Sequence, residues 1–167
     1  MATRIRPLRP EDVQWVVRLS LAAWAPVFAS FREILGPRIF ARIYPDWKTS
    51  QAAAVEKVCT DSAQGTAMAA WVAEEDGELA GFIAYSLDPA KRVGEVELLA
   101  VDPAFQNRGI GTLLNTLALD RMRESGADLA VAATGGDPGH APARRSYEKA
   151  GYTALPLVRF YKALGDS

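Results

Sequence analysis

The sequence predicts a single mixed α/β domain over residues 1–167, with a central β-sheet of about six to seven strands flanked by about four to five helices. Two apolar segments joined by Asp76-Gly77 are typical of a β-hairpin with a tight turn. A strand-like segment, a glycine-containing loop and an amphipathic helix then follow one another between residues 94 and 125. A length of 167 residues suits one domain with its own core, and no linker or internal repeat divides it.

In the first half of the chain, prolines and the hydrophobic pattern set the expected boundaries. Pro10, followed by two acidic residues, is typical of the first turn of a helix. Pro26 is expected to end or bend that helix. The expected elements are a strand at Thr3–Pro7, helices at Pro10–Trp24, Pro37–Tyr44 and Thr49–Thr60, and hairpin strands at Ala69–Glu75 and Glu78–Leu87.

In the second half, strands and helices alternate, which favours a right-handed parallel strand–helix–strand unit. Gly126 and Gly151 are plausible helix stops. The expected elements are strands at Gly94–Val101 and Leu129–Thr134, helices at Gly109–Ser125 and Pro142–Ala150, and two closing strands at Tyr152–Ala154 and Leu157–Ala163.

Composition excludes several classes of protein. The formal net charge of -1 provides no basic field for nonspecific nucleic-acid binding. Cys59 is the only cysteine, so neither an internal disulfide nor a cysteine-rich metal site is expected. The first ten residues carry three arginines and lack the apolar core of a signal peptide, so none is expected. No apolar run is long enough to cross a bilayer. We therefore expect a cytoplasmic monomer or homodimer with no metal, no nucleic-acid partner and no membrane partner.

The segment from Val101 to Thr112 is the most informative motif. The strand ends at Val101-Asp102-Pro103, and the glycines of Gln106-x-x-Gly109-x-Gly111 open a helix. Backbone N–H groups and the positive end of the helix dipole then converge on one point, which suits a phosphate. The spacing is neither that of a dinucleotide fingerprint nor that of a P-loop.

With this motif the chain resembles the GNAT superfamily of acetyl-CoA-dependent N-acetyltransferases. The family's phosphate signature, Gln/Arg-x-x-Gly-x-Gly/Ala after such a strand, matches Gln106 to Gly111. A late tyrosine followed by glycine and an aromatic residue recurs here as Tyr147-Glu148-Lys149-Ala150-Gly151-Tyr152. The opening segment Ile5 to Asp12 also looks like the family's first strand and helix, so the resemblance covers nearly the whole chain.

The resemblance implies a GNAT-like fold and acetyl-CoA as the cosubstrate. The N–H groups from Arg108 to Thr112 would hold the coenzyme's diphosphate, with Gln106 bracing the loop. The main chain of Leu99 and Val101 would pair with the pantetheine arm, and an N–H near Leu99 or Ala100 would polarise the thioester carbonyl. The residues expected to bind the coenzyme are Leu99, Ala100, Val101, Gln106, Arg108, Gly109, Ile110, Gly111, Thr112 and His140.

Catalysis needs a base for the acceptor amine and an acid for the leaving thiolate. By the resemblance, Tyr147 occupies the general-acid position. A lysine-like amine has a pKa of about 10.4, so a base helps to recruit its neutral form. Period-two alternation places Glu95 and Glu97 on one strand face with Leu99 and Val101, and either acid is a candidate base, with Glu97 preferred. The alternative is that both face solvent or pair with arginines.

Three roles are open to His140, the only histidine: capping a helix, touching the coenzyme or serving as base. Arg144 and Arg145 either lie on a solvated helix face or provide one contact to a coenzyme phosphate. Aromatic residues concentrate between Trp24 and Trp47, and most are expected in the core. Three of them are candidates for an acceptor pocket: Trp24, Phe28 and Phe31.

The sequence thus predicts an N-acetyltransferase that moves the acetyl group of acetyl-CoA to a primary amine, free or on a peptide, by direct attack in a ternary complex. Cys59 lies far from the glycine loop in sequence, which disfavours a covalent enzyme intermediate. A non-catalytic acyl-CoA-binding sensor is the alternative, and a nucleotide-binding domain is a weaker one.

Overall fold

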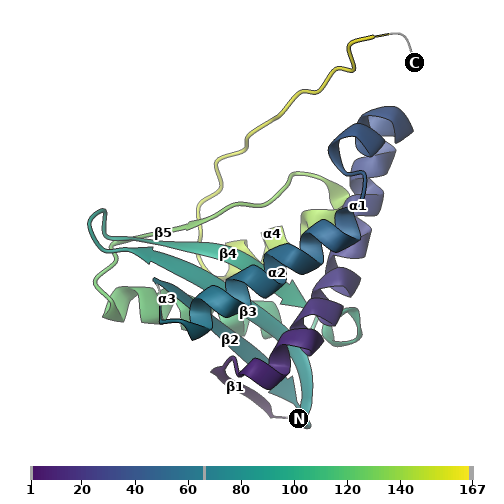
Figure 1. The fold of residues 1–167 in the computed structure, drawn as a ribbon. Coiled ribbons are helices and arrows are strands. Elements are labelled where there is room, and N and C mark those ends of the chain that lie inside the picture. The colour runs from purple at the N-terminus through teal and green to yellow at the C-terminus, as the bar shows by residue number, and fades with distance from the viewer. Residues whose placement is uncertain (1, 66, 166–167) are drawn as a thin grey trace.

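A five-stranded sheet in the order β1-β2-β3-β4-β5 runs through the centre of the molecule (Figure 1). The computed structural model describes residues 2–65 and 67–165. The first four strands are antiparallel, and β5 is parallel to β4. The strands are β1 (Thr3–Pro7), β2 (Met68–Glu75), β3 (Glu78–Asp88), β4 (Val93–Val101) and β5 (Leu129–Ala132).

Helices cover both faces of the sheet. One face carries α1 (Val13–Ile43) and α2 (Trp47–Ala63), and the other carries α3 (Ile110–Glu124) with α4 (Ala141–Lys149) beside it (Figure 1). The core accordingly has two parts, one around Phe82 beneath α1 and α2 and one around Ile83 beneath α3. Three short 3-10 helices connect the elements: η1 (Pro10–Asp12), η2 (Pro103–Phe105) and η3 (Pro138–His140).

The hairpin prediction is confirmed. Asp76 and Gly77 both have positive φ angles, 52° and 84°, as a primed turn between β2 and β3 requires. The strand β4, the helix α3 and the strand β5 also form the expected parallel unit.

The first helix does not end near Pro26, so the first of the two outcomes expected there is wrong. Helix α1 passes through Pro26, and its backbone breaks ten residues later at Gly36, where φ is 78°. Val27 is buried, and a Cβ on Gly139 of η3 would lie 2.6 Å from Val27 Cα. Packing against η3 therefore holds this part of the helix together, which a proline signal in the sequence does not report.

The two closing strands are also absent among the described residues, so the sheet has five strands instead of six or seven. After α4 the chain from Thr153 to Gly165 is extended and pairs with no strand. It leaves the body of the molecule and rises beside the far end of α1 (Figure 1), where the Arg38 guanidinium donates a hydrogen bond to the Gly165 carbonyl oxygen.

A β-bulge changes which side chains of β4 share a face. Ala84 pairs with Leu98 and the next residue, Tyr85, pairs with Val96, so β4 holds one extra residue at Glu97. Leu99 and Val101 consequently pack on the α3 side of the sheet, while Glu95 lies on the side of α1 and α2. The predicted common face for the acids and Leu99 is wrong, because strict alternation does not survive a bulge.

A buried ion cluster ties β1 to its surroundings. The Arg6 guanidinium lies 2.7 Å from the Asp12 carboxylate and 2.6 Å from that of Glu74. The hydrogen bond from Arg6, opposed by burial, gives Asp12 a pKa below its usual range. The cluster is structural, since Arg6 does not line the site described below.

Across residues 2–65 and 67–165, no helix combines the length and the apolar character needed to span a bilayer. The same residues contain no group of three or more His, Cys, Asp or Glu side chains arranged to hold a metal ion.

Candidate functional site

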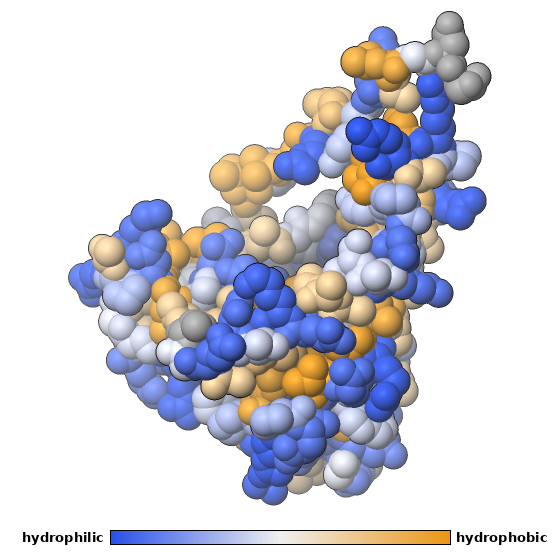
Figure 2. Space-filling model, viewed as in Figure 1, coloured by the Kyte–Doolittle hydropathy of each residue, from blue (hydrophilic) through white to orange (hydrophobic). Residues whose placement is uncertain are grey.

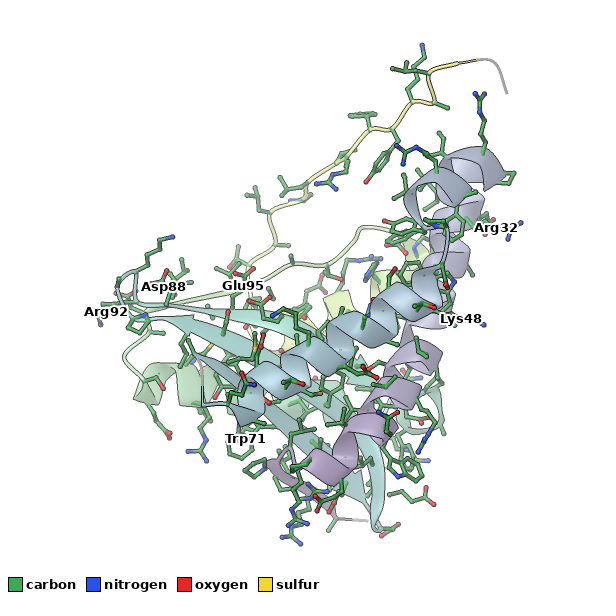
Figure 3. The ribbon with its side chains drawn as sticks, in the orientation of Figure 1. Arg32, Lys48, Trp71, Asp88, Arg92 and Glu95 are labelled. Atoms are coloured by element: carbon green, nitrogen blue, oxygen red, sulfur yellow. The ribbon has the colours of Figure 1, made fainter. Side chains whose placement is uncertain are left out.

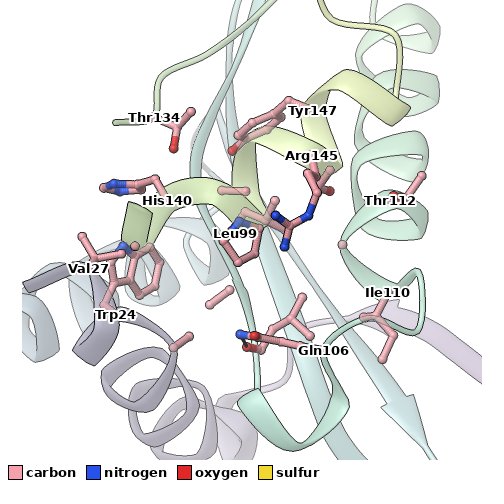
Figure 4. A pocket seen from close by; sticks show the side chains of 18 of the residues that line it. Trp24, Val27, Leu99, Gln106, Ile110, Thr112, Thr134, His140, Arg145 and Tyr147 are labelled. Atoms are coloured by element: carbon pink, nitrogen blue, oxygen red, sulfur yellow. Dashed lines mark hydrogen bonds between the residues drawn. The ribbon is translucent and has the colours of Figure 1, made fainter. Parts of the chain in front are cut away.

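A pocket opens where β4 and the chain after β5 separate. Their pairing stops at Val96 and Ala132, and beyond that point both segments line a cavity of about 330 Å³. Helix α1, the loop before α3, and the η3–α4 segment complete its wall (Figure 4). The edge of β4 from Glu97 to Val101 faces this cavity without a strand partner among the described residues, so its main-chain groups are available to an extended ligand.

The loop at one end of the pocket has the geometry of an anion site. Asp102 caps η2 by accepting a hydrogen bond from Ala104 N at 2.8 Å. Gln106 Nε2 donates to the Val101 carbonyl at 3.2 Å, which braces the loop as expected. Gly109 has φ of 80° and directly precedes α3, whose first N–H groups have no acceptor within the helix.

The second glycine of the motif brings α3 and α4 together. A Cβ on Gly111 would lie 2.9 Å from Ser146 Oγ. Buried Asn115 donates to the same Ser146 oxygen at 2.9 Å. The close contact holds α4 beside the anion loop, and Arg145 of α4 lines the pocket with its guanidinium group directed into it (Figure 4).

Of the three arginines considered for the coenzyme phosphates, Arg108, Arg144 and Arg145, only Arg145 lines the pocket. Arg108 is not among the lining residues, because its guanidinium lies 3.3 Å from the Glu75 carboxylate and over the Phe105 ring. Arg144 donates to the carbonyls of Gly135 and Asp137, at 2.7 and 2.6 Å, and so holds the loop before η3. Arg145 is the arginine of this pair that can reach an anion in the pocket.

Tyr147 of α4 lines the pocket opposite the edge of β4 (Figure 4). Burial raises the pKa of its phenol above the ordinary value, and the neighbouring Tyr152, 5.4 Å away between ring centroids, adds to the shift. The phenol therefore keeps its proton at neutral pH.

The two acids of β4 do not have equal access to the pocket. Glu97 lines it, and its carboxylate accepts a hydrogen bond from Ser86 Oγ at 2.6 Å. Glu95, two residues earlier in β4, is exposed and does not line the pocket. The structure thus retains Glu97 as a candidate base in the cavity.

His140 lies in the pocket wall across from Tyr147, near Trp24 and Val27 (Figure 4). Its Nδ1 is hydrogen-bonded to the buried carboxylate of Asp137. Burial alone would raise the pKa of Asp137, but hydrogen bonds led by that of His140 outweigh it and lower the pKa. The sequence analysis did not single out Asp137. The one feature that could have indicated it is its position three residues before the single histidine.

Of the predicted acceptor aromatics, only Trp24 lines the pocket. Phe28 stacks on Trp47 with centroids 4.3 Å apart. Phe31 stacks on Tyr44 and also contacts the His140 ring at 5.6 Å. The two phenylalanines therefore support the wall from behind, as members of an aromatic cluster between α1 and α2.

Most of the predicted coenzyme residues do gather in this one place. The lining includes Leu99, Ala100, Val101, Gln106, Gly109, Ile110, Gly111, Thr112 and His140. Cys59 is buried elsewhere, on the core side of α2, where burial raises the pKa of its thiol to about 11. A thiol so placed is neither ionised at neutral pH nor within the pocket.

Comparison with known proteins agrees with this arrangement. The acetyltransferase (GNAT) family matches residues 32–152. Over 87 residues the chain is 41% identical to a mycothiol acetyltransferase of Sanguibacter keddieii, a match that covers 49% of this chain and 27% of that protein. A second mycothiol acetyltransferase, from Thermomonospora curvata, is covered to 30%. The chain thus spans less than a third of the curated relatives it matches.

Two solved structures resemble the whole fold. The PaiA N-acetyltransferase of Thermoplasma acidophilum in complex with coenzyme A has a TM-score of 0.72 and 18% identity, covering 95% of this chain and 94% of that chain. A GNAT family acetyltransferase of Brucella melitensis in complex with acetyl-CoA has a TM-score of 0.61 and 26% identity, covering 92% and 84%. With the family match spanning well over half of the sequence, the chain belongs to the GNAT acetyltransferase family.

Proposed function

We propose that this chain transfers the acetyl group of acetyl-CoA to a primary amine by direct attack, without a covalent enzyme intermediate. The observation that carries the proposal is one continuous pocket with an anion loop at one end and a partly buried phenol facing a free strand edge at the other.

The anion loop suits the coenzyme's diphosphate. The N–H groups of Gly109, Ile110, Gly111 and Thr112 are directed outward from the start of α3, and the helix dipole adds positive potential there. Gly109 has open space where a side chain would stand, with no heavy atom within 4 Å of an added Cβ. Arg145 supplies a full positive charge to the same end of the pocket.

The edge of β4 suits the pantetheine arm and the thioester. An extended chain placed along Leu99 to Val101 finds main-chain donors and acceptors that no strand uses on that side. A main-chain N–H near Leu99 or Ala100 would stabilise the negative charge that develops on the thioester oxygen.

The reaction needs two proton transfers, one from the amine to a base and one from an acid to the departing thiolate. The amine nitrogen forms a bond to the carbonyl carbon and loses a proton to a base, and the carbon–sulfur bond breaks. Tyr147, whose pKa is raised, donates its proton to the departing thiolate. Solvent then returns a proton to the phenolate.

Glu97 is our assignment for the base, acting on the amine directly or through one water. It lines the pocket, and its carboxylate accepts a hydrogen bond from Ser86 Oγ. His140 is the second candidate, because the Asp137 carboxylate fixes its ring at the pocket wall. Glu95 lies outside the lining and is a weaker candidate.

The acceptor would occupy the end of the pocket between Trp24, Val27 and His140 (Figure 4). An indole and an aliphatic side chain beside a carboxylate suit a cationic amine attached to an apolar or ring-containing body. Because the chain is similar to mycothiol acetyltransferases, the acceptor of those enzymes belongs among the first amines to be screened.

The test is coenzyme A titration followed by an assay of thiol release across the acceptor of the mycothiol acetyltransferases, small amines, antibiotic amines, amino acids, peptides and lysine side chains. We expect coenzyme A to bind and at least one amine to release thiol from acetyl-CoA. Coenzyme A binding without thiol release for any amine would instead identify a non-catalytic sensor. Preferential binding of a dinucleotide over coenzyme A would reject acetyl-CoA as the ligand.

A further inference from the structure

Asn115 of α3 is a polar side chain in a place where the helix otherwise buries apolar ones. Hydrophilic residues cover much of the visible surface of the molecule (Figure 2), and charged side chains such as Arg32, Lys48 and Arg92 lie at that surface (Figure 3). Asn115, by contrast, is 0% exposed. A buried amide destabilises a fold unless hydrogen bonds replace those it made to water, so its partners decide what it contributes. The other buried residues of α3 are all apolar: Ile110, Leu114, Ala118 and Met122.

Among the described residues, the Asn115 amide is paired on one side. Its Nδ2 donates a hydrogen bond to Ser146 Oγ of α4 at 2.9 Å, while its Oδ1 has no partner in the part of the chain that the structure describes. An unpaired buried acceptor lowers the stability of the fold, and a leucine at this position would avoid that loss. Stability alone therefore does not explain an asparagine here, and the hydrogen bond to Ser146 is what the residue provides.

Ser146 lies where the pocket meets the start of α3. It lines the cavity, and a Cβ on Gly111 would lie only 2.9 Å from its Oγ. Gly111 belongs to the first turn of α3, whose N–H groups have no acceptor within the helix. Because Gly111 has no side chain, the Ser146 hydroxyl lies beside the end of the pocket that suits a diphosphate.

The hydrogen bond from Asn115 leaves the Ser146 hydroxyl free to act as a donor. A serine hydroxyl has one hydrogen to donate and two lone pairs that accept. Asn115 Nδ2 occupies a lone pair, so the hydroxyl hydrogen is directed away from the amide, and no hydrogen bond within the described part of the chain uses it. An anionic oxygen in the pocket is a fitting acceptor, because hydrogen bonds to charged groups are stronger than those between neutral groups.

We propose that Ser146 donates a hydrogen bond to the coenzyme's diphosphate from α4, and that Asn115 is the positioning residue that orients its hydroxyl. The inference rests on the proposed function, because it takes coenzyme A as the ligand. The diphosphate is then held from two helices, by the N–H groups of α3 and by Ser146 of α4. Since Tyr147 is the next residue, this contact also sets the position of the phenol relative to the bound coenzyme.

Calorimetric titration of coenzyme A into the full chain and its variants tests the pair. We expect Ser146→Ala and Asn115→Leu each to raise the dissociation constant about tenfold, and the double variant to bind no more weakly than Ser146→Ala alone, because Asn115 acts through Ser146. The Tm of Asn115→Leu should stay the same or rise. Thr116→Ala is the control, because Thr116 is the next residue of α3 but is exposed and does not line the pocket.

Three results of this titration would overturn the proposal. An unchanged dissociation constant in Ser146→Ala would remove the contact with the coenzyme. Losses that multiply in the double variant would show that Asn115 does not act through Ser146. A lower Tm together with weaker binding in Asn115→Leu would assign Asn115 a structural role instead of a positioning one.

Phosphorus NMR of coenzyme A bound at saturation locates the contact on the ligand. Ser146→Ala should shift the diphosphate resonances of the bound coenzyme and leave the resonance of its 3′-phosphate in place. Unshifted diphosphate resonances would overturn the proposal. If the unaltered chain does not bind coenzyme A, the proposed function fails together with this inference. If the chain binds coenzyme A and Ser146→Ala changes neither the affinity nor the spectrum, only this inference fails.

Discussion

The carboxylate of Asp137 is hydrogen-bonded to Nδ1 of His140, and this pair fixes the orientation of the only histidine at the wall of the pocket. The same Asp137 carboxylate accepts a hydrogen bond from Gly139 N at 3.0 Å, so one acid organises both the η3 turn and the imidazole. No hydrogen bond within the described part of the chain uses the opposite ring nitrogen, Nε2, so it is available to a ligand or water in the cavity.

Asp137→Asn should lower kcat/KM for the acceptor about tenfold, because a hydrogen bond to a charged group contributes roughly 1.5–3 kcal/mol. The dissociation constant of coenzyme A should change less, since the anion loop is untouched. Steady-state kinetics and calorimetry measure the two quantities separately. An equal loss of kcat/KM and of affinity for coenzyme A would mean that the substitution disturbs the whole pocket.

Gly109→Glu should abolish coenzyme A binding to within the limit of calorimetry. The new carboxylate would stand in the open space at the start of α3 and repel the diphosphate. Any side chain at this position also bears the strain of a φ of 80°. Gly126→Glu is the matched control, because Gly126 has φ of 90° and equally open space but lies beyond the other end of α3. A similar loss of binding in the control would contradict the assignment of the anion site.

Tyr147→Phe should lower kcat by about 10²-fold or more, as expected for loss of a general acid, with little change in coenzyme A affinity. Tyr152→Phe serves as control, because Tyr152 packs edge-on against Tyr147 and its pKa is also raised by burial, yet it does not line the pocket. A Tyr147→Phe variant with undiminished kcat would remove the acid role.

Glu97→Gln should lower kcat at neutral pH by about 10²-fold. Glu95→Gln, a neighbouring change outside the lining, should leave kcat unaltered. His140→Gln should affect kcat less than Glu97→Gln does. If His140→Gln lowers kcat more than Glu97→Gln does, His140 is the base instead of Glu97.

Asp12→Asn should destabilise the fold by about 3 kcal/mol at neutral pH, because buried Arg6 loses its buried partner and keeps only the half-buried Glu74. The pKa of Asp12 is lowered in the folded chain, so its contribution is present above the unfolded value of about 3.9 and is lost as pH falls through the folded value. Urea unfolding between about pH 2 and pH 7 should therefore show a shallower acid dependence in the variant.

Asp128→Asn is the control for that measurement. Asp128 pairs with Arg92 at 3.5 Å, but both side chains are exposed, and such pairs contribute little. Equal pH dependence in Asp12→Asn and the unaltered chain would show that the buried cluster does not govern acid stability.

Local signals in the sequence predicted the parts of the fold that depend on neighbouring residues. The Asp76-Gly77 turn, the glycine loop and the boundaries of α3 and α4 were correct to within one or two residues. Gathering of the loop glycines with Tyr147 followed from the order of these elements together with the family resemblance.

Features that depend on distant contacts were not predictable in the same way. The bulge at Glu97 is set by pairing with β3, and the continuation of α1 through Pro26 is set by packing on η3. The residues from Leu157 to Ala163 have strand composition, but composition alone does not say where a strand finds its edge.

The most direct test of the whole account is a crystal structure of the chain with acetyl-CoA bound. We predict the diphosphate on the N–H groups of Gly109 to Thr112, the thioester beside Leu99, and the Tyr147 hydroxyl within hydrogen-bond reach of the sulfur. A diphosphate bound away from the start of α3, or a Tyr147 phenol directed out of the pocket, would contradict it.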